Sequence, residues 1–225
     1  MKSLLGMFAK LWEPGQVKTR LAASTGDNPA AEIHRAFVET LATRLAGAAD
    51  LCRLCYAPAS AAEGFANFAQ LGWQLTPQFA GDLGRRMRQF FETSLAAAER
   101  VVLIGSDSPD LPAVYIAEAF ESLRSCPVVL GPAADGGYYL IGASRQVPPV
   151  FEGIAWSTSN VWRQTVERLQ SAGMKWHELP VWYDVDDDQS LNALLLRLQS
   201  EGQTDHALAD LRERLTALLN RRPAE

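Results

Sequence analysis

The chain has 225 residues, of which 48% are hydrophobic and 21% are charged. These proportions are typical of a globular domain and exclude disordered, collagen-like and coiled-coil proteins. With 21 lysines and arginines against 26 aspartates and glutamates, the formal net charge is −5. This acidic balance argues against nucleic acid as a partner, because domains that bind its backbone are usually basic.

The amino-terminal segment predicts a cytoplasmic protein. Its apolar stretch is too short for a signal peptide and runs directly into the turn at Pro14 and Gly15. No stretch of the sequence approaches the roughly 18 consecutive apolar residues of a membrane span. The sequence leaves the oligomeric state open, a homodimer included.

The three cysteines predict buried core positions. Cys52, Cys55 and Cys126 are an odd number, which makes a disulfide framework a poor interpretation. Cys52 and Cys55 lie in the strand-like segment LCRLCYA, where residues three apart face opposite sides of a sheet. A zinc site would need further ligands at suitable spacing, and the sequence offers none there.

Predicted strands and helices alternate along the chain. The strands are expected at 4–9, 51–57, 73–75, 101–105, 128–131, 138–143 and 175–179. The helices are expected from an Asx cap at 26–29 to about residue 48, at 59–70, 83–98 and 113–124, from a cap at Ser157 or Thr158 to about Ala172, at 189–200 and at 205–221. This alternation predicts a single α/β domain over residues 1–225, with a mostly parallel central sheet flanked by helices. Ligands are expected beyond the carboxyl ends of its strands.

The loop after the first predicted strand contains two cations. Lys18 supplies a point charge and Arg20 a forked donor, a combination suited to a polyphosphate. Gly15 and Thr19 belong to the same loop and are expected to contribute to binding. The alternative is that both cations are solvated charges before a helix. Neither a Walker P-loop nor a Rossmann GxGxxG motif is present.

Acidic residues follow the central strand. A carboxylate at the end of a buried strand is costly without a partner, so Asp107 is a candidate metal ligand. Its alternative role is the N-cap of the next helix. Asp110 fits that capping role better, because it lies just ahead of Pro112.

A second acidic cluster lies near the carboxyl end. Asp184 and Asp186 alternate on an extended segment, which places both carboxylates on one face and suits a hard cation. Asp187 or Asp188 is expected to cap the following helix instead.

The remaining motifs are less specific. The segment Asp135-Gly136-Gly137 predicts either a hairpin turn or a close backbone approach to a ligand. The three histidines, His34, His177 and His206, are expected to be structural. Ser106 is not part of a GxSxG motif, which weakens a serine hydrolase. Trp156, Trp162, Trp176 and Trp182 are expected to pack the core, with an acceptor groove as the alternative.

Taken in order, six segments resemble a known bacterial family. They are PGQVKTRLA, GDLGRRM, VVLIGSDSPDLP, VVLGPAADGGYYLIG, IAWSTSNV and YDVDD. They resemble GT-A-like transferases often labelled glycosyltransferase or radical-SAM/selenodomain-associated transferase. That family is similar to the 2-phospholactate guanylyltransferases and, more distantly, to molybdenum-cofactor nucleotidyltransferases. The resemblance covers roughly residues 3–195 and implies the nucleotide-diphospho-sugar transferase fold.

The resemblance also implies site roles. Lys18 and Arg20 match a basic loop that holds donor phosphates. The residues Gly81, Asp82 and Arg86 match a GDLGxRM loop that lines the nucleotide or acceptor pocket, and Asp135, Gly136 and Gly137 match a DGG loop near the acceptor. Asp107, next to Ser106 in the binding loop, matches the Mg²⁺ ligand, which Asp184 and Asp186 would complete; Mn²⁺ could replace Mg²⁺.

The sequence departs from the family pattern at two places. Leu11, Trp12 and Glu13 stand where a short proline-containing stretch is more frequent, and Asp187-Asp188 replaces Thr-Pro. Neither change removes a predicted ligand, but the first bears on base recognition.

Three functions remain open at this point. The preferred one is Mg²⁺-dependent nucleotidyl transfer from a nucleoside triphosphate to a small phosphorylated or acidic acceptor, with Asp107 in the catalytic set and with Lys18 and Arg20 stabilising the departing pyrophosphate. The second is glycosyl transfer from a nucleotide sugar, with Asp135 as base. The third is a nucleotide-binding protein without turnover.

Overall fold

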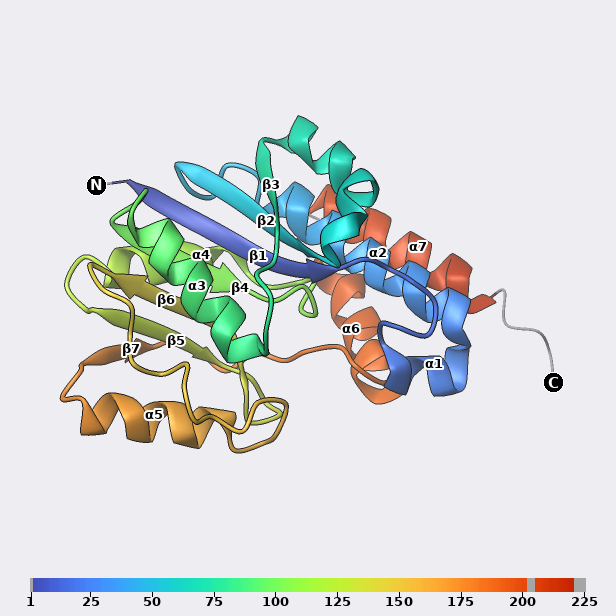
Figure 1. The fold of residues 1–225 in the computed structure, drawn as a ribbon. Helices are drawn as coiled ribbons and strands as arrows, with labels where there is room; N and C mark the ends of the chain where they lie inside the picture. The colour runs from blue at the N-terminus through green and yellow to red at the C-terminus, as the bar shows by residue number, and fades with distance from the viewer. Residues whose placement is uncertain (1, 202–204, 221–225) are drawn as a thin grey trace.

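The computed structural model describes residues 2–201 and 205–220, which form one α/β domain around a seven-stranded sheet (Figure 1). The strands are β1 (Ser3–Lys10), β2 (Leu51–Ala57), β3 (Trp73–Pro77), β4 (Arg100–Ile104), β5 (Val128–Pro132), β6 (Tyr138–Ser144) and β7 (Trp176–Glu178). Their order is β3-β2-β1-β4-β6-β5-β7, and only β6 runs antiparallel to its neighbours. The predicted mostly parallel sheet is therefore confirmed.

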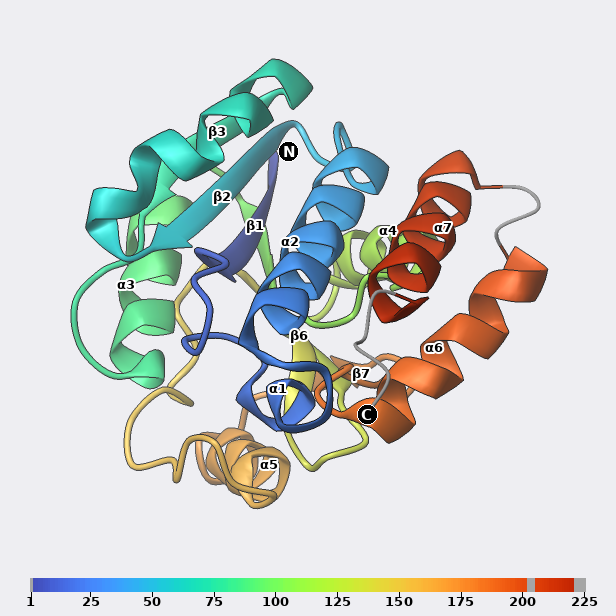
Figure 2. The same cartoon turned by 90° about the vertical axis from the view of Figure 1, so that its right-hand side faces the viewer.

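Helices cover both faces of this sheet, as Figures 1 and 2 show. They are α1 (Thr19–Thr25), α2 (Asp27–Arg44), the 3₁₀ helix η1 (Ala59–Leu71), α3 (Leu83–Leu95), α4 (Ala113–Ser122), α5 (Val161–Ser171), α6 (Asp188–Glu201) and α7 (His206–Asn220). One core cluster joins the sheet to α2, η1 and α4, and a second joins it to α3 and α5. Cys52 belongs to the first cluster and Cys55 to the second, which confirms that they face opposite sides.

A third core cluster lies outside the sheet and joins the two ends of the chain. Leu21 of α1 and Phe37 of α2 pack there with Leu191 of α6 and Leu211 of α7, all nearly fully buried. Val185, just before α6, belongs to the same cluster. The amino-terminal loop and the carboxyl-terminal acidic segment are thus anchored on one apolar centre.

Three helix starts differ from the sequence predictions. The helix α1 was not predicted, since its seven residues show too short an apolar pattern. Helix α2 has Gly26 at its N-cap without a side-chain cap, and α5 begins at Val161 rather than at Ser157 or Thr158. The Thr158 hydroxyl instead donates to the carbonyl of Ala155 at 2.7 Å.

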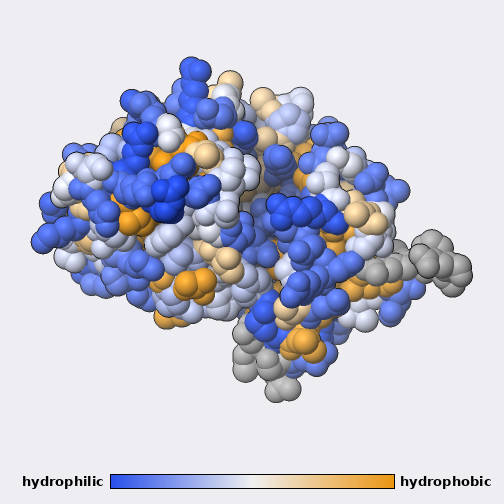
Figure 3. All heavy atoms as spheres, turned by 90° about the horizontal axis from the view of Figure 1, so that it is seen from below, coloured by the Kyte–Doolittle hydropathy of each residue, from blue (hydrophilic) through white to orange (hydrophobic). Residues whose placement is uncertain are grey.

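No helix in the described ranges is long and apolar enough to cross a bilayer. The face seen in Figure 3 is mainly hydrophilic, with scattered apolar patches.

Gly84→Ala is expected to destabilise the protein by about 1–3 kcal/mol, the usual cost of overpacking. A Cβ atom at Gly84 would lie 2.3 Å from the carbonyl oxygen of Phe151 and 2.4 Å from Nε1 of Trp156. The clash outweighs the gain of about 1 kcal/mol in helix propensity. Urea unfolding measures the loss. Gly105→Ala is the matched control, because nothing lies within 4 Å of its Cβ; an equal effect of both substitutions would contradict the prediction.

Candidate functional site

Half of the predicted site residues gather at the carboxyl end of the sheet, around a cavity of about 490 Å³. Three of the segments that line it are the loop between β1 and α1, the loop after β4, and the segment before α6. The backbone N–H of Val185 donates to the carbonyl of Asp107 at 2.9 Å, which holds the last two segments together. The lining includes Lys18, Thr19, His34, Arg86, Ser106, Asp107, Asp184 and Asp186.

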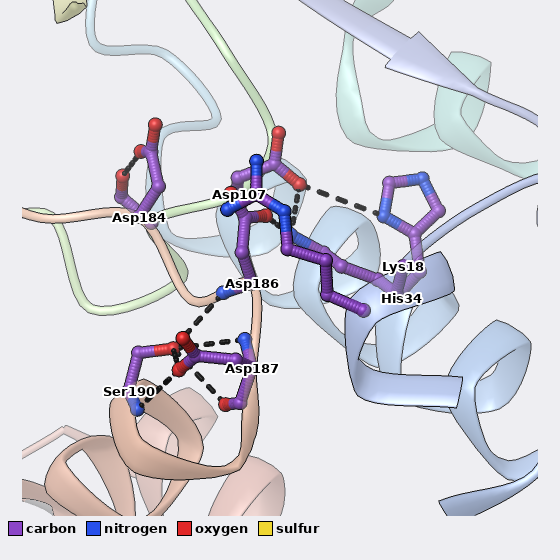
Figure 4. A network of polar contacts seen from close by, with 9 residues as sticks. Lys18, His34, Asp107, Asp184, Asp186, Asp187 and Ser190 are labelled. Atoms are coloured by element: carbon purple, nitrogen blue, oxygen red, sulfur yellow. Dashed lines mark hydrogen bonds and ion pairs between the residues drawn. The ribbon is translucent and has the colours of Figure 1, made fainter. Parts of the chain in front are cut away.

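Lys18 is the central cation of this cavity. Its side chain is only 3% exposed, and its Nζ forms an ion pair with Asp107 and lies 3.0 Å from Oδ1 of Asp186 (Figure 4). Burial alone would lower the pKa of the ammonium group, but the attraction of the two carboxylates outweighs burial and raises it. Lys18 therefore stays charged. Its backbone is left-handed, with φ of 48°, and directs the side chain inward.

Arg20 takes a different position from Lys18, although both were predicted to bind the same phosphates. Its side chain is 76% exposed, and its guanidinium lies 4.0 Å from Oδ2 of Asp186. It lines a second cavity of about 430 Å³ rather than the first. Gly15 forms the preceding turn, with φ of 75°.

The three predicted metal ligands are not equivalent. Asp107 and Asp186 both contact Lys18, whereas Asp184 accepts a hydrogen bond from the Ser108 hydroxyl at 2.7 Å and lies to one side in Figure 4. Burial and then repulsion by Asp107 raise the pKa of Asp184 to about 7. The pKa of Asp107 is lowered, because the attraction of Lys18 outweighs the effect of burial.

The metal site stays a prediction. Within the described ranges, no three His, Cys, Asp or Glu side chains form a group that could hold a metal ion. The donor chemistry nevertheless fits Mg²⁺, which is often held by one or two carboxylates together with water and substrate phosphates.

His34 is a site residue that the sequence interpretation missed. It lies on α2, is buried, and donates from Nε2 to the carbonyl of Lys10 at 3.1 Å. Its Nδ1 has no hydrogen-bond partner among the described residues and lies 3.9 Å from Oδ1 of Asp107. Burial, more than any neighbouring charge, lowers the pKa of the imidazole. The sequence signal for a buried His34 was its position beside Ile33 and Phe37 on the apolar face of α2.

Only part of the GDLGRRM segment reaches the first cavity. Arg86 lines it, and its guanidinium donates to Oε1 of Gln78 at 3.0 Å. Asp82 is instead the N-cap of α3, where Oδ1 accepts from the N–H of Arg85 at 2.8 Å. Gly81 precedes this cap with φ of 113°. The local sequence therefore shapes a helix start more than a ligand contact.

The Asp135-Gly136-Gly137 segment is both a hairpin connection and a cavity wall. It joins β5 to β6, and Oδ1 of Asp135 accepts from the N–H of Gly137 at 2.9 Å. A Cβ atom at Gly136 would lie 2.4 Å from the carbonyl oxygen of Ser159, so glycine is required there. Asp135 and Gly137 line the second cavity.

Two capping predictions have opposite outcomes. Asp187 caps α6 as expected, since Oδ1 accepts from the N–H of Ser190 at 2.8 Å. Asp110 does not cap α4, for which Pro112 is the N-cap residue without a side-chain bond. Asp110 is buried and accepts hydrogen bonds from the Tyr183 hydroxyl and, at 3.0 Å, from Nε of Arg197. Both partners are distant in the sequence, Tyr183 before α6 and Arg197 on it, which explains why the proximity of Asp110 to Pro112 was misleading.

Asp184→Asn is expected to raise the melting temperature at pH 8 and to change it little at pH 4. The folded-state pKa of about 7 exceeds the ordinary value of 3.8. The protonated carboxyl of Asp184 therefore makes its full contribution to folding stability below about pH 3.8, and this contribution is lost as the pH rises through 7. Asparagine removes that loss and can still accept from Ser108. Circular dichroism melts at both pH values measure the difference.

The control for this prediction is Asp187→Asn. Hydrogen bonds from the Ser190 side chain and backbone lower the pKa of Asp187, so its stabilising effect is present at neutral pH and is lost as the pH falls. This variant should lower the melting temperature at pH 8. An equal shift by Asp184→Asn at pH 4 and pH 8 would contradict the linkage.

Comparison with models of known protein families shows to which family the chain belongs. The model described as "Uncharacterized protein conserved in bacteria (DUF2064)" matches residues 38–158, more than half of the chain. The chain belongs to this family. The matched range of this DUF2064 protein contains Asp107 and Asp135, whereas Lys18, Arg20, Asp184 and Asp186 lie outside it. A comparison with curated proteins gave no match.

Solved structures share the fold of this DUF2064 protein. A crystal structure from Desulfovibrio desulfuricans G20, described as a candidate nucleotide-diphospho-sugar transferase, is 36% identical, with a TM-score of 0.87 and full coverage of both chains. CMP:2-keto-3-deoxy-manno-octonic acid synthetase complexed with CTP is 13% identical, with a TM-score of 0.56, covering 88% of this chain and 98% of that one. The inositol-1-phosphate CTP transferase from T. maritima is 14% identical, with a TM-score of 0.55, covering 95% and 97%. The nucleotide-diphospho-sugar transferase fold is confirmed.

Proposed function

We propose that this protein is a Mg²⁺-dependent nucleotidyltransferase that joins a nucleoside monophosphate group to a small phosphorylated acceptor. The observation that carries the proposal is the buried Lys18 ammonium group between Asp107 and Asp186, on a cavity at the carboxyl ends of the strands. One protein of the same fold is described as complexed with CTP and another as a CTP transferase, which supports a nucleoside triphosphate as donor.

The residues of the first cavity suit a triphosphate. A Mg²⁺ ion held by Asp107 and Asp186 together with phosphate oxygens would neutralise the charge that develops on the transferring group. The charge of Lys18, released from those carboxylates, is then available to the donor phosphates in the same cavity. Lys10 and Arg86 add two further cations to the lining. Positive groups aimed at the developing charge are a principal source of catalysis.

The reaction needs no strong base. An oxygen of the acceptor phosphate forms a bond to the α-phosphorus of the donor, and the bond from that phosphorus to the α,β-bridging oxygen breaks. The electron pair of the broken bond leaves with pyrophosphate. A dianionic phosphate has no proton to lose, so the neutral, buried His34 need not act as a base.

Glycosyl transfer is the second candidate function. The protein from Desulfovibrio desulfuricans G20, whose sequence is 36% identical to this one, is described as a candidate nucleotide-diphospho-sugar transferase. That description favours this alternative. An inverting reaction would need a base toward an acceptor hydroxyl. Asp135 lines the second cavity, and its Oδ2 has no partner among the described residues, so it can take that role.

Product analysis separates these functions. The protein is incubated with Mg²⁺, each nucleoside triphosphate in turn and a pool of sugar and polyol phosphates, and the products are identified by mass spectrometry. Pyrophosphate together with a nucleotide-linked acceptor is the expected result. Release of a nucleoside diphosphate from nucleotide sugars, with sugar transfer, would establish the glycosyl alternative. Nucleotide binding without either product would overturn both in favour of a binding protein.

A further inference from the structure

Two cavities meet at the acidic cluster and share its three carboxylates. Lys18, His34 and Arg86 line only the first cavity, whereas Arg20, Asp135 and Trp156 line only the second. Reactants that approach from the two cavities would therefore meet at Asp107, Asp184 and Asp186. A transferase with two substrates needs such a shared boundary, because the reacting atoms must come within about 3–3.5 Å.

Arg20 gives the second cavity a cation close to this boundary. Its guanidinium is 4.0 Å from Asp186, which is the outer limit of an ion pair, and its side chain is 76% exposed. A guanidinium presents five N–H donors in a fork that matches a phosphate group. An anion bound by Arg20 would lie directly beside the shared carboxylates, where an attacking phosphate has to be.

The rest of the second cavity suits hydroxyl groups. Ser157 and Ser159 are exposed, and their hydroxyls have no partner among the described residues. Oδ1 of Asp135 is occupied by the N–H of Gly137, and Oδ2 is open to a donor. An apolar ligand would leave these groups without hydrogen bonds on desolvation, which is costly.

An aromatic wall completes the cavity. The rings of Trp156 and Tyr138 meet edge to face, with centroids 6.4 Å apart, and both residues line the cavity. Flat aromatic rings provide apolar contact for the carbon skeleton of a ligand whose edges carry hydroxyls. Ser157 turns the chain here in a left-handed conformation, with φ of 63°, which is rare for serine and is typical of strained functional segments.

We infer that the second cavity binds the acceptor, that the acceptor is a polyhydroxylated monophosphate of the sugar or polyol class, and that Arg20 binds its phosphate. This assignment rests on the proposed nucleotidyl transfer. It separates Arg20 from the donor phosphates, which the first cavity and Lys18 bind. Asp135, Ser157 and Ser159 then select for the hydroxyls of the acceptor.

Isothermal titration tests this assignment with defined probes. Glucose 1-phosphate, ribose 5-phosphate, glycerol 3-phosphate and inositol 1-phosphate are compared with propyl phosphate, which lacks the hydroxyls, and with glucose, which lacks the phosphate. Each titration is made with Mg²⁺ alone and with Mg²⁺ plus a non-hydrolysable nucleoside triphosphate analogue. At least one hydroxylated phosphate is expected to bind at least about 10-fold more tightly than propyl phosphate and glucose, as one or two hydrogen bonds would give.

Arg20→Gln should weaken the binding of that probe about 10- to 100-fold, because this is the change in affinity that corresponds to losing hydrogen bonds to a charged group. The affinity for the triphosphate analogue should change by less than about twofold. Arg85→Gln is the matched control, since Arg85 lines neither of the two cavities, and it should alter neither affinity. Ser159→Ala should weaken the binding of the hydroxylated probe and leave the affinity for propyl phosphate unchanged. Melting curves establish that each variant is folded.

Two results would overturn the assignment: a loss of analogue affinity in Arg20→Gln as large as the loss for the phosphate probe, or propyl phosphate binding as tightly as every hydroxylated phosphate. Failure of the wild-type protein to bind any nucleoside triphosphate analogue would instead refute the proposed function. The titrations with Mg²⁺ alone still judge the second cavity in that case.

Discussion

Lys18→Met is expected to lower the rate of pyrophosphate release about 10²–10³-fold, the usual cost of removing one preorganised charge at a transferring group. The side chain is 3% exposed and its ammonium group contacts two carboxylates, so no solvated cation can take its place. Methionine keeps most of the length and the apolar stem. The measurement is a coupled pyrophosphate assay under saturating triphosphate.

Lys175→Met is the control for this substitution. Lys175 is exposed and lies just before β7, so its replacement should leave the rate within about twofold. Lys18→Arg is informative as well, because it keeps the charge but not the fit of a compact ammonium group in a buried position. Full activity of Lys18→Met would remove the central support of the proposed function.

Asp110→Ala should reduce the free energy of unfolding by about 3 kcal/mol, the lower end of the cost of breaking a buried ion pair. Asp110 is 1% exposed and binds both Tyr183 and Arg197. The Arg197 side chain is 29% exposed, and partial solvation of the remaining guanidinium keeps the loss at that lower end. Urea unfolding gives the value.

A double-mutant cycle with Arg197→Met isolates the contribution of the pair. The double variant should be more stable than the sum of the two single losses predicts, since the second substitution removes a charge that the first left without this partner. Glu121→Ala is the control, because Glu121 and Arg124 form an exposed ion pair worth less than about 1 kcal/mol. A loss below about 1 kcal/mol for Asp110→Ala would show that the pair does not stabilise the fold.

The sequence predicts the sheet well because each strand carries its own local signal. The branched run at 101–104 and the alternating core residues of β1 need cover on both faces in any fold, and the structure supplies it. Helix starts are less predictable, since Gly26 and Asn160 begin helices without side-chain caps. Local chemistry alone does not mark such positions.

The candidate site is predictable as a set of residues but not as an arrangement. Motif positions locate Lys18, Asp107, Asp184 and Asp186 at the sheet edge. No local pattern says that Arg20 turns to a second cavity, that His34 faces Asp107 from α2, or that Asp110 binds Arg197. Each of these outcomes depends on contacts between distant segments, which only the assembled fold determines.

The ion pair between Lys18 and Asp186 joins residues that are 168 positions apart, and the cluster around Val185 adds the last two helices to the same support. Helices α6 and α7 pack against α1 and α2. During synthesis, the sheet can be completed at β7 while α6 and α7 are still inside the ribosome. A nascent chain from which β7 has emerged but α6 and α7 have not should therefore hold folded strands and yet lack the assembled Lys18–Asp186 site until α6 and α7 emerge.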